Sequence, residues 1–158
     1  MRHLAAQALS DPFQFRRQPI GVPVLVNLAK LDPRRMVFIG LLWIAAVMLL
    51  FSLLGSTMGF SVETLGFYAL FLPLMAALGY DRLVTAAMLI LGALSGVMGA
   101  TVNPFSIGVA AGEAGVSIGQ GIGLRLLLWA LLTAMSIGWV LRYAARVRRD
   151  PRHSLCGV

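Results

Sequence analysis

Long stretches of apolar sequence with almost no charge constrain this chain most. Between Met36 and Tyr80 the only acidic or basic side chain is Glu63. Of the 158 residues, 59% are hydrophobic and only 12% are charged, whereas ordinary soluble domains contain about 25% charged residues. Because a helix satisfies its own backbone hydrogen bonds inside a bilayer, the composition predicts an all-α integral membrane protein.

The basic residues gather in two segments that flank the apolar sequence, where eleven of the 13 Lys and Arg residues lie. This distribution is typical of a multi-pass protein of the plasma (inner) membrane with both termini in the cytoplasm, so the lipid bilayer is an expected partner. The net charge of +7 also suggests nucleic acid. The sequence shows no basic helix or sheet interleaved with aromatic residues, however, and we expect no nucleic-acid partner. The eleven residues are Arg2, Arg16, Arg17, Lys30, Arg34, Arg35, Arg142, Arg146, Arg148, Arg149 and Arg152.

Three regions follow from these patterns. Residues 1–36 form a basic cytoplasmic or interfacial segment, in which four of the seven prolines exclude a long helix. Residues 37–144 form the membrane domain, and residues 145–158 form a basic cytoplasmic tail. Residues 1–12 contain no apolar core of the length that a signal peptide needs, so we expect an uncleaved amino end. The single cysteine, Cys156, excludes an internal disulfide.

The first part of the membrane domain, residues 37–78, is predicted to be a re-entrant helical hairpin. Its two apolar arms, Val37 to Leu54 and Leu65 to Leu78, contain 18 and 14 residues, whereas a spanning helix needs about 20. The small, polar tract between them, residues 55–64, suits a hairpin tip. Two full membrane spans are the alternative.

Residues 83–112 are predicted to form a discontinuous helix, and residues 122–142 a closing transmembrane helix. The discontinuity falls at residues 99–104, because Pro104 lacks a backbone donor and excludes Asn103 from helical geometry.

Other residues give weaker expectations about the helix surfaces. Glycines recur at four-residue spacing, either for close helix contacts or simply because membrane helices are rich in glycine, and we favour the second interpretation for each single pair. These glycines are Gly92 with Gly96, Gly108 with Gly112, and Gly115 with Gly119 and Gly123. Trp139 and Tyr143 suit an aromatic belt at the membrane interface. We expect Asp81, Arg82 and Glu113 to be surface charges.

Small polar side chains gather at the two interruptions. Non-helical backbone at membrane depth is tolerated only where protein or a water-filled cavity satisfies it. In secondary transporters such breaks offer carbonyls and helix ends to Na⁺ and to anionic substrates, so Na⁺ or H⁺ is the expected coupling ion. The amide of Asn103 can both donate and accept hydrogen bonds, and the alternative is a plain kink in which this amide caps the next helix. The candidate substrate- and ion-binding residues are Ser56, Thr57, Ser61, Glu63, Thr64, Thr101, Asn103, Pro104 and Ser106.

Glu63 is the most informative single residue. An ionised carboxylate at the bilayer centre costs about 2.5–3.5 kcal/mol, so it is expected to be paired, protonated or facing water, where it can bind a substrate amine, a cation or a proton. If residues 37–78 form two full spans, Glu63 is instead a solvated loop carboxylate. Arg125, near the start of the closing helix, either pairs with a substrate carboxylate or extends to the membrane interface, and we expect the second.

The sequence offers little for catalysis. No histidine lies between Leu4 and Arg152, and no lysine follows Lys30. An intramembrane hydrolase needs a nucleophile beside a base, and the chain has no GxSxG, HExxH or paired-carboxylate motif. We therefore expect no enzyme activity, no catalytic residue, no metal site and no cofactor.

Several strings of the sequence resemble one transporter family. They are FSLLGSTMGFSVETLGFYALFLPLMAALGYD, GATVNPFSIGVAAGEAG, GIGLRLLLWA and RYAARVRRDP. Over about residues 45–151, their order and spacing are similar to the YfcC-type proteins of the ion transporter superfamily, which are grouped with the anaerobic C4-dicarboxylate carriers. The resemblance implies a secondary active transporter, a symporter or antiporter, for small carboxylates or amino acids, basic amino acids included. It places a hairpin-tip carboxylate on Glu63 and an NPF break on Asn103, Pro104 and Phe105.

The chain also departs from this family pattern. Many relatives carry a second glutamate where this chain has Val62. Relatives are built of two inverted halves, and this chain matches one half, with no clear counterpart for residues 1–35. The resemblance therefore implies half of an inverted-repeat transporter fold. Because a site shared between two repeats needs both, we expect a second transporter half or a homo-oligomer as partner. The alternative is a non-transporting membrane subunit or a truncated, inactive remnant of such a carrier.

Overall fold

The computed structural model describes residues 33–150, 154 and 155, and every regular element among them is a helix. This confirms the all-helical prediction for the described part of the chain. Most of the expected basic segment 1–36 lies outside the described residues, as do residues 151–153 and 156–158 of the expected tail. The elements are α3 (Pro33–Met58), the 3₁₀ helix η2 (Val62–Phe67), α4 (Tyr68–Ala77), α5 (Arg82–Met98), the π-helical turn η3 (Pro104–Gly108), α6 (Val109–Ala114) and α7 (Ile122–Arg149).

Two of these helices, at Val37–Met58 within α3 and Ile122–Arg149, are long and apolar enough to cross a membrane. The 22 residues of the first extend about 33 Å at about 1.5 Å per residue, and a hydrocarbon core is about 30 Å thick. The first hairpin arm is longer than expected because the helix continues beyond Leu54, where Thr57 Oγ1 donates to the carbonyl of Leu53 at 2.8 Å. The second arm, Val62–Ala77, is a shorter apolar helix.

Local backbone chemistry sets the ends of these helices. α3 ends where Gly59 adopts φ +74°, a left-handed conformation that glycine reaches at little cost. α5 begins after Asp81, whose Oδ1 accepts a hydrogen bond from the backbone N–H of Val84 at 2.8 Å. After the break at residues 99–103, the N–H of Gly108 donates to the carbonyl of Asn103 at 3.0 Å and closes the π-helical turn.

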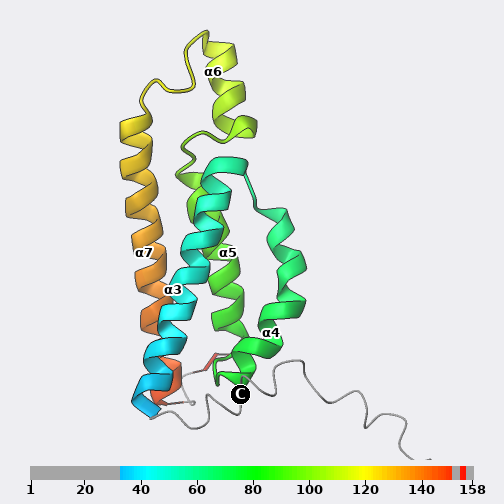
Figure 1. Ribbon diagram of the computed structural model, residues 1–158, viewed down its shortest axis with the longest axis vertical. Coiled ribbons are helices and arrows are strands. Elements are labelled where there is room, and N and C mark those ends of the chain that lie inside the picture. Colours follow the sequence, from blue (N-terminus) through cyan, green and yellow to red (C-terminus); the bar gives the residue numbers. More distant parts are fainter. Residues whose placement is uncertain (1–32, 151–153, 156–158) are drawn as a thin grey trace, which may run out of the picture. The chain divides into compact units, whose positions relative to one another are not determined.

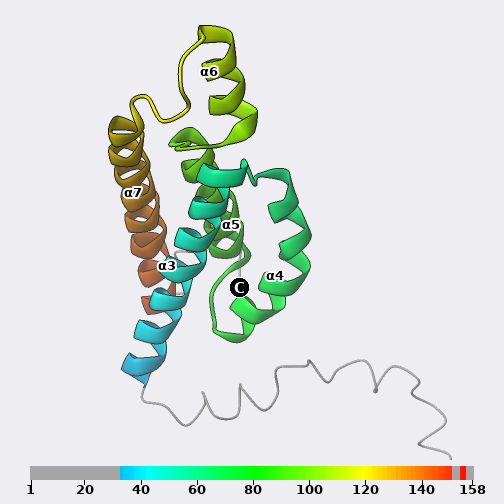
Figure 2. The ribbon, with the colours of Figure 1, turned by 45° about the horizontal axis from the view of Figure 1, so that its top comes forward.

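Four helices pack together. α5 contacts α3, α4 and α7, and α3 also contacts α7. Both views place α3 and α5 between α4 and α7 (Figures 1 and 2). α4 runs back alongside α5 after the turn at residues 59–61, and α6 packs on η3 beyond the end of α5.

Glycine makes the α3–α5 contact unusually close. A Cβ atom added to Gly96 would lie 2.0 Å from the carbonyl oxygen of Ser52, and one added to Gly92 would lie 3.1 Å from Cα of Met48. For this pair, reading the four-residue spacing as mere composition is wrong, because the backbones touch. The other spaced glycines have no such neighbour within 3.6 Å; they are Gly108, Gly112, Gly115, Gly119 and Gly123.

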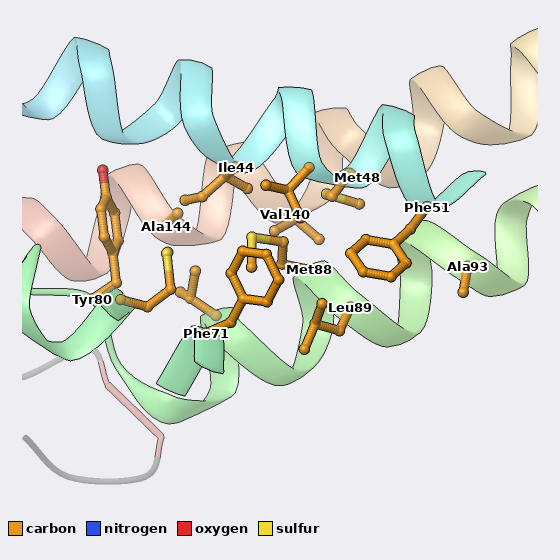
Figure 3. Close-up of a cluster of buried hydrophobic side chains, with 13 residues drawn as sticks. Ile44, Met48, Phe51, Phe71, Tyr80, Met88, Leu89, Ala93, Val140 and Ala144 are labelled. Carbon is orange, nitrogen blue, oxygen red and sulfur yellow. The ribbon is translucent and has the colours of Figure 1, made fainter. Parts of the chain in front are cut away.

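Large apolar side chains fill the space between the helices (Figure 3). Met48 of α3 and Met88 and Leu89 of α5 are completely buried. Phe51 meets Phe71 of α4 edge to face, with ring centroids 6.3 Å apart. This core holds α3, α4 and α5 together. The hairpin tip and the break after α5 are thereby held beside each other at one end of the bundle.

Candidate substrate- and ion-binding site

A buried hydroxyl contact joins the end of α3 to the break after α5. The hydroxyl oxygens of Ser56 and Thr101 lie 3.0 Å apart, and the N–H of Thr101 donates to the carbonyl of Ser56 at 3.2 Å. Ser56 Oγ also donates to the carbonyl of Gly99 at 3.3 Å. Both hydroxyl residues are buried. The non-helical backbone is therefore satisfied by protein, as membrane depth requires.

Asn103 has two roles in this arrangement. Its Oδ1 accepts a hydrogen bond from the N–H of Phe105 at 2.9 Å, so it does cap the next helical turn. Its amide also lies against Gly59, where an added Cβ would be 2.8 Å from Nδ2. Asn103 is 2% exposed, and within the described residues its side chain forms hydrogen bonds only through Oδ1. The two N–H groups of Nδ2, which lie beside the hairpin tip, are therefore available to donate to a ligand.

The other polar residues of the tip form a separate local cluster. The N–H of Ser61 donates to Oε2 of Glu63 at 3.1 Å, and Thr64 Oγ1 donates to the carbonyl of Ser61. Thr64 is buried, whereas Glu63 is exposed. A surface hollow of about 250 Å³ lies beside this cluster, and its lining residues are Ser61, Val62, Thr64, Leu65, Ile90, Ala93 and Leu94.

The remaining candidates lie apart from these contacts. Thr57 lies within α3 and bonds to its own helix, while Pro104 and Ser106 are exposed at the start of η3. The structure therefore brings together Ser56, Thr101 and Asn103.

Arg125 binds the backbone of the break and of the loop before α7. Its guanidinium donates to three backbone carbonyls: Nη1 to Thr101 at 3.2 Å and to Ile118 at 2.8 Å, and Nη2 to Gln120 at 2.6 Å. Carbonyls outside regular helix need donors, and a guanidinium offers five N–H groups. The extension of Arg125 to the membrane interface stays a prediction. Arg125 ties the break to the loop between α6 and α7.

A buried polar cluster, which the sequence analysis missed, joins α3, α5 and α7. Ser52 Oγ lies 2.6 Å from Thr133 Oγ1 and accepts from Trp129 Nε1 at 3.0 Å, and Ser95 Oγ donates to it at 3.5 Å. A signal was present: Ser52 and Ser56 are four residues apart in an apolar run, which places them on one helix face.

Asp81 is a second correction. It is 5% exposed rather than a surface charge, because its Oδ2 accepts from the hydroxyls of Tyr143 and Ser154, each at 2.8 Å. Tyr143 thus makes a contact inside the bundle, whereas Trp139 is 71% exposed, as an interface residue would be. Arg82 and Glu113 are exposed, as predicted.

The turn beside Asp81 is held by Arg148. Its Nη1 donates to the carbonyl of Leu78 at 2.5 Å, and its guanidinium lies 5.7 Å from the centre of the Tyr80 ring. Burial raises the pKa of the Tyr80 phenol, and the charge of Arg148 opposes that shift. Within residues 33–150, 154 and 155, no group of three His, Cys, Asp or Glu side chains is placed to hold a metal ion.

Comparison with known proteins identifies the family. The model of the C4-dicarboxylate anaerobic carriers (DcuC) matches residues 21–156. The chain belongs to this carrier family. The resemblance to YfcC-type proteins is confirmed as well: a protein of Escherichia coli (strain K12) named "Putative basic amino acid antiporter YfcC" is 36% identical over 111 residues, which cover 70% of this chain and 22% of that protein.

A second relative also matches the chain over only part of its own length. An uncharacterized protein of Haemophilus influenzae (strain ATCC 51907 / DSM 11121 / KW20 / Rd) is 35% identical over 100 residues, which cover 63% of this chain and 20% of that protein. The chain spans about a fifth of the length of these curated relatives. No solved structure matches it. The chain thus belongs to a carrier family, and its described residues include two apolar helices of membrane-spanning length.

Proposed function

We propose that this chain supplies one half of the binding site of a secondary active transporter for small carboxylates or amino acids, basic amino acids included. The observation that carries the proposal is the contact between two polar interruptions, in which Ser56 bonds to Thr101 and Asn103 lies against Gly59. Carriers with repeated halves build their sites from such breaks, and the second half completes them. The second half would be another chain or a second copy of this one.

The side chains at the breaks suit this chemistry. Nδ2 of Asn103 can donate to a substrate carboxylate, and the hydroxyl and carbonyl oxygens around Thr101 are ligands that Na⁺ accepts. Glu63, exposed at the tip, can take a substrate amine or a proton. Transport would proceed by rocking this bundle against its partner around the shared site.

The test begins with the assembled protein. Native mass spectrometry of the chain, gently extracted from its own membrane, identifies any second copy or second apolar subunit. The complex is then placed in liposomes, and uptake of C4-dicarboxylates, arginine and lysine is measured under imposed Na⁺ and H⁺ gradients. An assembled complex that moves none of these compounds would favour the alternative of a non-transporting subunit or inactive remnant.

Asn103 provides the sharpest variant, because its cap and its donor can be separated. Asn103→Ser keeps an oxygen that can cap the N–H of Phe105 but removes the Nδ2 donors. We expect this variant to melt like the wild type and to lose uptake, whereas Asn103→Ala loses both the cap and uptake while still inserting into the membrane. Normal uptake by Asn103→Ser would remove Asn103 from the binding site.

A further inference from the structure

Five exposed arginines lie at one end of the helical bundle. Arg35 lies near the start of α3, Arg82 begins α5, and the other three follow one another along the end of α7; these are Arg142, Arg146 and Arg149. The start of α3 and the end of α7 lie at the same end in both views (Figures 1 and 2). The hydrogen bond between Tyr143 and Asp81, at 2.8 Å, holds the end of α7 beside the start of α5. We call these five arginines the basic end.

The three arginines of α7 share one helix face with apolar residues. Their spacing of four and then three residues places them in a single row along the helix. The same row continues backwards through Trp139, Met135 and Leu131, which are 71%, 71% and 54% exposed. One face of α7 therefore carries exposed apolar side chains that lead directly to exposed cations.

The length of α7 sets the depth in a bilayer at which its exposed face changes from apolar side chains to arginines. Residues 122–141 extend about 30 Å at about 1.5 Å per residue, which equals the thickness of a hydrocarbon core of about 30 Å. If these residues cross the bilayer, Arg142 lies where the acyl chains end, and Arg146 lies about 6 Å further along the helix. That is the depth of the phospholipid phosphates.

Among the described residues, two carboxylates lie at this end beside the five exposed arginines. In the described sequence, the carboxylates at the ends of α5 and α7 are Asp81 and Asp150. Asp81 is 5% exposed and accepts hydrogen bonds from Val84, Tyr143 and Ser154. Arg148 is not part of the basic end, because it is turned inward onto Leu78 and Tyr80. The five arginines of the basic end are therefore exposed cations that a neighbouring anionic group can contact.

We propose that the basic end binds the headgroup of an anionic phospholipid, with the lipid's acyl chains lying along the exposed apolar face of α7. Arginine forms charge-assisted, bidentate hydrogen bonds with phosphate oxygens. The apolar row below the arginines selects a lipid over a free phosphate, because only a lipid carries chains to cover it. This inference goes beyond the proposed transport function and does not depend on it.

The test uses the full chain in a neutral detergent and native mass spectrometry to measure the Kd of two lipids. Phosphatidylglycerol and phosphatidylcholine with identical acyl chains are compared. We expect the wild type to prefer the anionic lipid. The triple variant Arg142→Gln, Arg146→Gln, Arg149→Gln should bind it about a hundredfold more weakly, since each arginine near a membrane surface contributes about a fivefold change in affinity.

A charge-matched variant provides the control. Arg125→Gln removes one charge near the start of α7, at the opposite end of that helix, and is compared with Arg146→Gln. It should leave the preference for the anionic lipid unchanged. Equal Kd values for the two lipids in the wild type would overturn the proposal. So would an equal loss in the control variant, or displacement of the lipid by glycerol phosphate, which has no acyl chains. If the triple variant does not fold, Arg146→Gln replaces it, with an expected weakening of about fivefold.

Discussion

At the scale of single residues, hydroxyl and indole groups decide how the helices are held. Ser52 lies at the centre of the polar cluster, where it contacts Trp129, Thr133 and Ser95 from two other helices. A buried polar atom without a partner is costly in an apolar environment, so such groups are placed where partners exist. Hydrogen bonds between membrane helices average about 0.6 kcal/mol each, and their directionality also fixes which helix faces meet.

Trp129→Phe tests this role. The variant keeps an aromatic ring but loses the Nε1–H that bonds to Ser52 at 3.0 Å. We expect the free energy of unfolding in detergent to fall by about 0.5–1.5 kcal/mol. Trp139→Phe is the matched control, because Trp139 is 71% exposed, and it should unfold like the wild type. Equal stability of both variants would show that the indole hydrogen bond contributes nothing.

At the scale of elements, the close backbone contact between α3 and α5 brings the two interruptions together. Gly96 allows the carbonyl of Ser52 to approach its Cα, and Gly55 allows the same for the carbonyl of Ala93, since a Cβ there would lie 2.5 Å away. The contact between Ser56 and Thr101 lies one turn further along the same two segments. A larger distance between α3 and α5 at these glycines would therefore also weaken the contact between Ser56 and Thr101.

Gly96→Ala should force the two helices apart. Its Cβ would lie 2.0 Å from a backbone oxygen, which cannot rotate away as a side chain can. We expect a loss of about 1–3 kcal/mol in the free energy of unfolding, the usual cost of overpacking. Gly112→Ala serves as the control because nothing lies within 4 Å of that glycine. The measurement is the thermal unfolding of both variants. Equal melting temperatures would contradict the close contact between α3 and α5.

Arg125→Gln should loosen the loop between α6 and α7. Its guanidinium binds the carbonyls of Ile118 and Gln120 in that loop and of Thr101 in the break. We expect faster amide hydrogen exchange in residues 115–121 and in residues 99–103, with the core of α5 unchanged. Arg142→Gln removes the same charge at the far end of α7 and should change neither segment. Unchanged exchange in the Arg125 variant would mean that these contacts do not hold the loop.

At the scale of the whole molecule, the depth of the hairpin tip distinguishes the two topologies. A re-entrant hairpin keeps the tip within protein, whereas two full spans expose it on the side opposite the termini. The second arm, Val62–Ala77, is a shorter apolar helix than the first, and about 20 residues are needed to cross. The short second arm favours a re-entrant hairpin, whereas the first arm, Val37–Met58, is long enough to cross. The re-entrant hairpin therefore stays a prediction.

Thiol labelling in intact vesicles measures this depth. In a Cys156→Ser background, Ser61→Cys should resist a membrane-impermeant maleimide added on the side opposite the termini. Ser117→Cys, in the exposed loop before α7, should react from that side and shows that the reagent works. Reaction of both thiols from that side would establish two full spans instead.

The helical class, the two basic flanking segments, the break before Pro104 and the carrier family could all be predicted from the sequence. Each of these depends on composition or on neighbouring residues, since proline and glycine act within a few positions of themselves. The sequence could not predict that Ser56 contacts Thr101, 45 positions away, that Arg125 binds carbonyls or that Asp81 is buried. Those outcomes depend on which helix faces pack together, and here that packing rests on glycines whose spacing alone did not distinguish a close contact from ordinary membrane composition.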